Sequence, residues 1–163
     1  LANISQVPGR MEKIGKKSTP KIFIDYAHTP DALEKVLKTL KDKTDGKLIC
    51  VFGCGGNRDI GKRKDMAIAV SKFADMSIVT SDNPRNENPK KIISEITKHM
   101  KGSFSIEINR VKAIEKAIQF AKKEDAILIA GKGHEKYQEI KGVKHPFSDQ
   151  KCVRNALKYY KTN

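Results

Sequence analysis

The chain contains 163 residues, of which 38% are hydrophobic and 32% are charged, and its formal net charge is +14. This length suits one domain with a substantial core, and no apolar run approaches the ~18 residues that a membrane-spanning helix needs, which excludes a membrane protein. The positive charge suggests a nucleic-acid partner, but the lysines are scattered and aromatic residues make up only 6%, so we expect a solvated lysine-rich surface and no nucleic acid.

Residues 1–19 are polar and irregular, and we expect the tail of a preceding domain or an ordered lead-in. The chain starts at Leu1 without an initiator methionine or the features of a signal peptide, which indicates a piece of a longer protein. From Pro20 onward, apolar runs typical of strands alternate with segments that have helical spacing. Strands are predicted at residues 21–26, 47–52, 76–80, 103–108 and 126–130, and helices at 29–40, after 61, at 88–99 and at 111–122.

The end of the chain departs from this alternation. Residues 137–140 and 143–147 flank a short Lys141-Gly142 turn and predict a hairpin or an antiparallel edge, and residues 148–160 predict a last helix that Ser148 caps. Strands that alternate with helices of this length imply right-handed crossovers. The predicted fold is α/β, a doubly wound Rossmann-like sheet of about six mostly parallel strands.

Four loops that follow predicted strands are rich in glycine and polar residues, whereas the loops at the opposite edge are plain charged turns. Such loops gather at the carboxyl edge of a parallel sheet, by which we mean the edge where its strands end, and open α/β sheets bind ligands there. The four loops are residues 25–30, 53–59, 81–85 and 131–135.

The loop at residues 81–85 holds Arg85 on a short, fixed turn, because Pro84 keeps Asn83 out of the helical region. A guanidinium there offers a two-pronged donor that fits a carboxylate or a phosphate. Glu135 follows a double-glycine turn and suits an ammonium group. Together with Arg58 on the second loop, these side chains indicate a ligand with charges at both ends, such as an amino acid.

The glycine-rich loop leaves several interpretations open. A dinucleotide fingerprint fails because Arg58 stands at its third glycine position, and a phosphate loop over residues 56–63 would need a hydroxyl where Arg63 stands. A tight turn and an anion site with Arg58 as its arm are the alternatives. His28 and His134 have no third ligand at metal-site spacing, so we expect hydrogen-bonding histidines and no metal site.

Three cysteines, Cys50, Cys54 and Cys152, contain no CxxC pair, which favours reduced thiols and a cytoplasmic protein.

Four segments resemble the carboxyl-terminal, glutamate-ligase-type domain of the Mur ligase family, namely residues 25–33, 53–59, 82–85 and 131–135, and residues 7–12 resemble the junction that precedes it. The match is closest to members that add the third residue of the peptidoglycan stem peptide. The resemblance implies that residues 1–19 are the junction from a missing central ATPase domain and that residues 20–163 bind the incoming amino acid and close over ATP.

The resemblance also implies the reaction. The whole ligase would use ATP and magnesium, bound mainly by absent domains, to phosphorylate a UDP-sugar peptide, and the amine of the amino acid would then form the amide in peptidoglycan synthesis. We expect no catalytic residue in this fragment, which should be inactive alone. A folate or polyglutamate ligase domain and a basic nucleic-acid-binding domain are the alternatives.

The Asp-Asn-Pro-Arg motif at residues 82–85 marks family members that add meso-diaminopimelate rather than lysine. By this resemblance, Arg85 would hold the distal carboxylate, and the Gly131 carbonyl and Glu135 the distal ammonium. A similar diamino diacid such as lanthionine would also fit. The predicted amino-acid site contains Arg58, Asn83, Arg85, Gly131 and Glu135, and the predicted nucleotide-facing residues are Arg10, Asp25, Tyr26 and His28.

Overall fold

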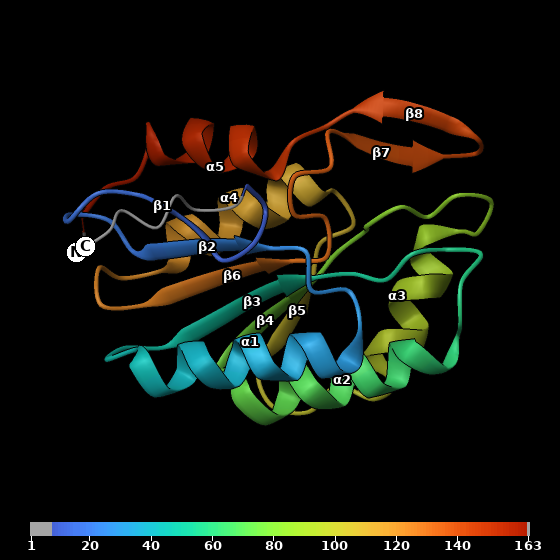
Figure 1. Cartoon of the computed structure of the whole chain (residues 1–163), viewed down its shortest axis with the longest axis horizontal. Helices are drawn as coiled ribbons and strands as arrows, with labels where there is room; N and C mark the ends of the chain where they lie inside the picture. The colour runs from blue at the N-terminus through green and yellow to red at the C-terminus, as the bar shows by residue number, and fades with distance from the viewer. Residues whose placement is uncertain (1–7, 163) are drawn as a thin grey trace.

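A six-stranded sheet forms the centre of the computed structural model, which describes residues 8–162 (Figure 1). Its strand order is β1-β2-β6-β3-β4-β5, and β2 to β6 all run parallel. The strands are β1 Glu12–Ile14, β2 Lys21–Asp25, β3 Leu48–Phe52, β4 Met76–Val79, β5 Phe104–Ile106 and β6 Ala126–Ala130. The predicted α/β fold with a mostly parallel sheet is confirmed.

Helices cover both faces of the sheet, with α1 and α2 on one side and α4 and α5 on the other (Figure 1). Buried apolar side chains of α1, α2 and α3 pack on one face, and α4 and α5 enclose a second apolar cluster on the other face. Strands β3 and β6 are buried along their whole length, as central strands of a doubly covered sheet must be. The helices are α1 Pro30–Lys43, α2 Gly61–Phe73, α3 Pro89–Thr97, α4 Arg110–Phe120 and α5 Asp149–Leu157.

Polar side chains fix where the helices begin. The Thr29 side chain accepts a hydrogen bond from the Ala32 N–H in the first turn of α1. The side chains of Asn88 and Ser148 likewise accept a backbone N–H in the first turns of α3 and α5. The cap at Ser148 was predicted from the sequence. The three caps matter for the site because α1, α3 and α5 each begin at or near the carboxyl edge.

The description of residues 1–19 as irregular is wrong for residues 12–14. They form β1, which pairs antiparallel with β2 and brings Glu12 opposite Ile24. Three residues with alternating exposure are too short for a recognisable pattern, and the exposed edge of β2 supplies the hydrogen-bond partners that order them. Residues 1–7, which include the first residue of the junction-like segment 7–12, lie outside the described residues.

The predicted hairpin is confirmed and forms a sheet of its own. Strand β7 Tyr137–Ile140 pairs antiparallel with β8 Val143–Pro146, and the pair stands apart from the main sheet at its carboxyl edge (Figure 1). Across residues 8–162, helices of the length and apolar character needed to span a bilayer do not occur.

Candidate functional site

A cavity of about 260 Å³ opens at the carboxyl edge of the sheet. The loops that follow β2, β3, β4 and β6 all contribute to it, so the four polar loops singled out in the sequence meet at one place. All five residues of the predicted amino-acid site line the cavity, together with Tyr26, His28 and Cys54; the five are Arg58, Asn83, Arg85, Gly131 and Glu135.

The glycine-rich loop after β3 is clasped against the loop after β4. The Gly56 N–H donates to the Asn83 carbonyl at 2.8 Å, and Nη1 of Arg85 donates to the Gly56 carbonyl at 2.9 Å. A Cβ added at Gly56 would lie 1.9 Å from the Pro84 carbonyl oxygen, so no larger residue fits without moving the loops. The glycines of this loop therefore permit close approach of two backbones.

The side chain of Arg63 stabilises this loop. This side chain is 2% exposed, pairs with Glu87 and Glu95, and donates to the Gly55 carbonyl. A phosphate loop over residues 56–63 needs a serine or threonine hydroxyl at position 63 to bind magnesium, and a buried, ion-paired guanidinium stands there instead. These residues therefore do not form a phosphate loop. Glu87 in turn accepts the Asn57 N–H at 2.7 Å, and the hydrogen bond from Arg63, followed by that from Asn57, lowers the pKa of Glu87.

Gly131 and Arg85 both have left-handed backbone conformations, with φ of +112° and +53°. A Cβ at Gly131 would lie 2.6 Å from Oδ2 of Asp82, which accounts for glycine at this place. Arg85 has no such freedom, so its conformation depends on hydrogen bonds from the surrounding chain.

Lys132 is a central residue of the site that the sequence did not reveal. Its ammonium is fully buried and donates to Oδ1 of Asn83 at 2.7 Å and to the Tyr137 carbonyl at 2.9 Å. It also lies 3.4 Å from Glu135 and 3.5 Å from Asp82. The buried ammonium of Lys132 thus contacts the carboxylates of Asp82 and Glu135 and the side-chain amide of Asn83.

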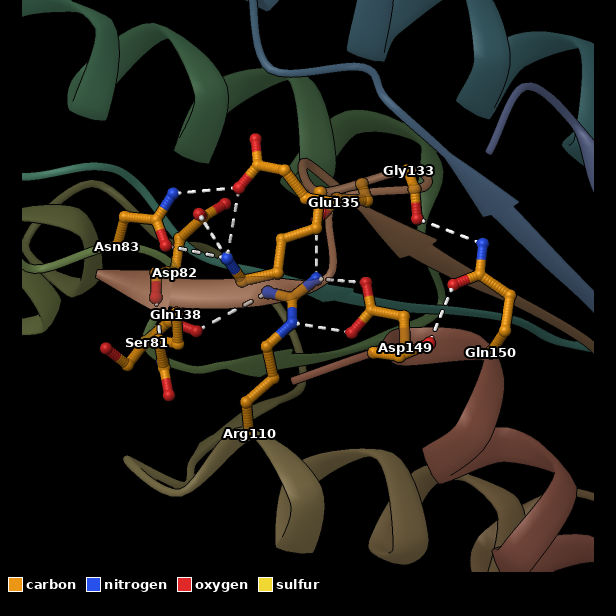
Figure 2. A network of polar contacts seen from close by, with 12 residues as sticks. Ser81, Asp82, Asn83, Arg110, Gly133, Glu135, Gln138, Asp149 and Gln150 are labelled. Atoms are coloured by element: carbon orange, nitrogen blue, oxygen red, sulfur yellow. Dashed lines mark hydrogen bonds and ion pairs between the residues drawn. The ribbon is translucent and has the colours of Figure 1, made fainter. Parts of the chain in front are cut away.

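The contact with Lys132 fixes the orientation of Asn83. Because its oxygen faces the ammonium, its nitrogen faces Oε1 of Glu135, to which it donates at 2.9 Å (Figure 2). Lys132, Asn83 and Glu135 therefore form a connected polar network on one wall of the cavity. The sequence signal was a lysine between two glycines directly after an apolar strand, and it resembled a surface loop.

A second unpredicted network joins Arg110 and Asp149 at the ends of β4 and β6, from which two of the cavity loops extend. The guanidinium donates to both carboxylate oxygens at 2.9 Å, and it also donates to the Ala130 and Ser81 carbonyls at 3.1 and 3.4 Å (Figure 2). Both side chains are fully buried. Burial alone would lower the pKa of Arg110, but the attraction of Asp149 outweighs it and raises the pKa. This pair ties the ends of β4 and β6 to the starts of α4 and α5.

The four predicted nucleotide-facing residues line a hollow beside the cavity, and Tyr26 and His28 belong to both. Asp25 accepts the Met11 and Ala27 N–H groups, each at 2.8 Å, so its carboxylate orders the chain around it. His28 lies 2.8 Å from the Tyr26 carbonyl and its ring packs edge-on to the Tyr26 ring. Arg10 and His28 are exposed.

Cys54 lines the cavity but is not a nucleophile. Burial, reinforced by the charge of Asp82, raises its pKa to about 12, so the thiol is protonated at neutral pH. Within residues 8–162, His, Cys, Asp and Glu side chains do not gather in groups of three or more that could hold a metal ion. The charged side chains that line the cavity include the guanidiniums of Arg58 and Arg85 and the carboxylate of Glu135. Such an arrangement fits a ligand that carries both charges.

Comparison with known proteins places these features in context. The family model "Mur ligase, glutamate ligase domain" matches residues 9–133. A UDP-N-acetylmuramoyl-L-alanyl-D-glutamate–2,6-diaminopimelate ligase of Aquifex aeolicus is 54% identical over 153 residues, which are 93% of this chain and 32% of the relative. The ligase of the same name from Neisseria meningitidis serogroup A is 52% identical over 159 residues, 96% of this chain and 32% of the relative.

Solved structures of related ligases have a similar fold. The structure of a ligase of that name superposes with a TM-score of 0.87 and 44% identity, over 93% of this chain and 32% of that one. A folylpolyglutamate synthase of Yersinia pestis has a TM-score of 0.63 at 22% identity, over 78% of this chain and 29% of that one, which is a likeness of fold alone. The chain thus spans about a third of the length of the curated relatives it matches.

Proposed function

This chain belongs to the Mur ligase family, as a glutamate ligase domain of it, and we propose that it binds the incoming amino acid for an ATP-dependent ligase that adds meso-diaminopimelate to UDP-N-acetylmuramoyl-L-alanyl-D-glutamate. The relatives named for that reaction support this proposal. The observation that carries it is the shared cavity, in which Arg58 and Arg85 face the same space as Glu135.

The charges of the cavity match the distal end of this amino acid. Arg85 binds the distal carboxylate, because a guanidinium presents paired N–H donors to two carboxylate oxygens. Glu135 and the Gly131 carbonyl accept the distal ammonium. Asn83, held by Lys132, keeps the Glu135 carboxylate in place, and Arg58 on its exposed loop attracts the proximal carboxylate.

This arrangement explains a preference for a diamino diacid over lysine. Lysine has no distal carboxylate, so its binding would leave the Arg85 guanidinium desolvated without its ligand partner. Sites built to hydrogen-bond a polar group reject analogues that lack it by about 10⁴–10⁵ when the group is buried. Arg85 is 20% exposed, so we expect a smaller factor, on the order of 10³. Lanthionine keeps both distal groups and passes this selection.

The remaining parts of the reaction belong to the rest of the proposed ligase. ATP, bound with magnesium mainly by other domains, would supply the phosphoryl group that activates the carboxylate of the UDP-sugar peptide. The free amine of the amino acid then forms the C–N bond, and inorganic phosphate leaves. In this chain, residues 1–19 form the junction to the ATPase domain, and Arg10, Tyr26 and His28 offer a guanidinium and two rings to the nucleotide. Asp25 orders that loop through its main-chain contacts. We propose a cytoplasmic enzyme, and no nucleic acid is part of the proposal.

Arg85→Ala in the complete ligase tests the proposal. We expect diaminopimelate addition to fall by about 10³-fold, while acyl phosphate formation on the UDP-sugar peptide persists because Arg85 takes no part in it. Product formation by chromatography and trapping of the acyl phosphate with hydroxylamine measure the two steps separately. Arg154→Ala, which removes an exposed arginine on α5, is the matched control. Unchanged diaminopimelate addition in Arg85→Ala would show that the assignment of Arg85 is wrong.

A further inference from the structure

The hairpin β7–β8 is attached to the loop that carries Asn83 and Arg85. The Arg85 N–H donates to the Glu139 carbonyl at 3.0 Å, and the Lys141 N–H donates to the Arg85 carbonyl at 2.9 Å, so the two segments form a parallel bridge. Gln138 adds a side-chain bond to the Asp82 carbonyl at 2.7 Å (Figure 2). The hairpin is thus a support for this loop.

Glu139 is the residue of the hairpin that reaches both predicted ligand-binding side chains of the loop. Its backbone N–H donates to Oδ1 of Asn83 at 3.0 Å, and its carboxylate accepts Nε of Arg85 at 3.2 Å. The Glu139 and Arg85 side chains are 26% and 20% exposed, so the ion pair is partly shielded from water. An arginine side chain without such a partner would sample several rotamers.

The donors of Arg85 are divided between the protein and the cavity. A guanidinium has five N–H groups. Glu139 takes Nε, and the Gly56 carbonyl takes one N–H of Nη1. Over residues 8–162, Nη2 is not engaged in a hydrogen bond, and Arg85 lines the cavity. A ligand carboxylate can therefore bind the remaining N–H groups while Glu139 stays in place.

We propose that Glu139 is a positioning residue for ligand recognition: it fixes the plane of the Arg85 guanidinium so that the free N–H groups face the distal carboxylate of the amino acid. This inference rests on the proposed function. A carboxylate at this place aligns the guanidinium before the ligand arrives, and the cost of ordering a long side chain then does not fall on binding. Glu139 does not compete with the ligand, because the two carboxylates use different N–H groups.

Kinetics of the complete ligase with two amino acids test this inference. In Glu139→Leu we expect the KM for meso-diaminopimelate to rise about tenfold, with kcat close to wild type, because one charge-assisted hydrogen bond to Arg85 is lost. The slow addition of lysine, which makes no use of Arg85, should not change. Glu139→Gln keeps an acceptor oxygen and should raise the KM by about threefold or less. Glu115→Leu, which changes an exposed glutamate on α4, is the matched control.

The outcomes separate the two proposals. An equal loss with both amino acids would mean that Glu139 only supports the fold, and an unchanged KM for diaminopimelate would also overturn the inference. A wild-type ligase that adds no diaminopimelate would overturn the proposed function instead.

Nuclear magnetic resonance on this chain reads the contact without any assay of activity. We expect the Arg85 Nε–H resonance to exchange slowly with water in wild type and in Glu139→Gln, and rapidly in Glu139→Leu. Rapid exchange in wild type would overturn the inference. Thermal unfolding followed by circular dichroism confirms that the variants are folded.

Discussion

Replacing Arg110 by methionine removes the cation of the buried Arg110–Asp149 pair and leaves the Asp149 carboxylate without its ion-pair partner. Asp149 is 0% exposed, and two of the four hydrogen bonds of Arg110 reach its carboxylate. Breaking a buried pair by removal of one partner costs about 3–5 kcal/mol, since an uncompensated charge stays buried. We therefore expect Arg110→Met to lower the free energy of unfolding by about 4 kcal/mol.

Urea unfolding measures this loss. With an m-value of about 2 kcal/mol/M, the midpoint should fall by about 2 M while the m-value itself stays constant. The double variant Arg110→Met/Asp149→Leu removes both charges and fills the space with apolar groups. It should recover at least half of the loss, because buried ion pairs are often replaceable by apolar residues. Recovery stays incomplete because the Ser81 and Ala130 carbonyls lose their donor.

Two results would refute this reasoning. A loss below about 1 kcal/mol in Arg110→Met would mean that water reaches Asp149 and solvates its charge. A double variant as unstable as the sum of the two single variants would mean that the residues act independently. Lys112→Met, an exposed lysine on the same helix, is the matched control and should change stability by less than about 0.5 kcal/mol.

Gly56→Ala should lower stability by about 2 kcal/mol in urea unfolding and weaken amino-acid binding, because the added Cβ meets the Pro84 carbonyl at 1.9 Å. The hydrogen bond from Arg63 lowers the pKa of Glu87 in the folded protein. The ionised Glu87 carboxylate therefore stabilises the fold fully above its unfolded-state pKa of about 4.3, and this stabilisation is lost as the pH falls through the folded-state pKa. Wild type should therefore lose more stability than Glu87→Gln between about pH 5 and pH 3, and parallel losses would contradict this assignment. Iodoacetamide at pH 8 should label Cys54 only after unfolding, because burial raises its pKa to about 12; rapid labelling of the native protein, detected by mass spectrometry, would disprove it.

The sequence was sufficient for the fold and for the place of the site because both depend on local patterns. Alternating strands and helices imply a parallel sheet, and in such a sheet the loops after the strands share one edge. The four loops do meet there. The order of the strands was not predictable in this way. Strand β6 lies between β2 and β3, and this central place brings the loop of Gly131 into the cavity.

The contacts that hold the site rigid escaped the sequence analysis for a different physical reason. Lys132 reaches Asn83 across 49 positions of the chain, and Arg85 reaches Glu139 across 54. A charged residue in a single sequence is expected at the surface, since lysine and arginine are rarely buried without a partner. The partners of Lys132 and Arg110 become visible only when the strand order is known. The same holds for β1, whose three residues are ordered by the edge of β2.

The main-chain bridge between Arg85 and the hairpin has a consequence for engineering. The loop keeps its path through backbone groups of Glu139 and Lys141, so its shape does not require an arginine side chain. Asparagine tolerates a φ of +53° better than most residues, and a position already held in this conformation can accept it with little rearrangement. Changing residue 85 alone is therefore a practical first step toward a ligase domain that accepts amino acids whose far end carries an ammonium group but no carboxylate, such as lysine.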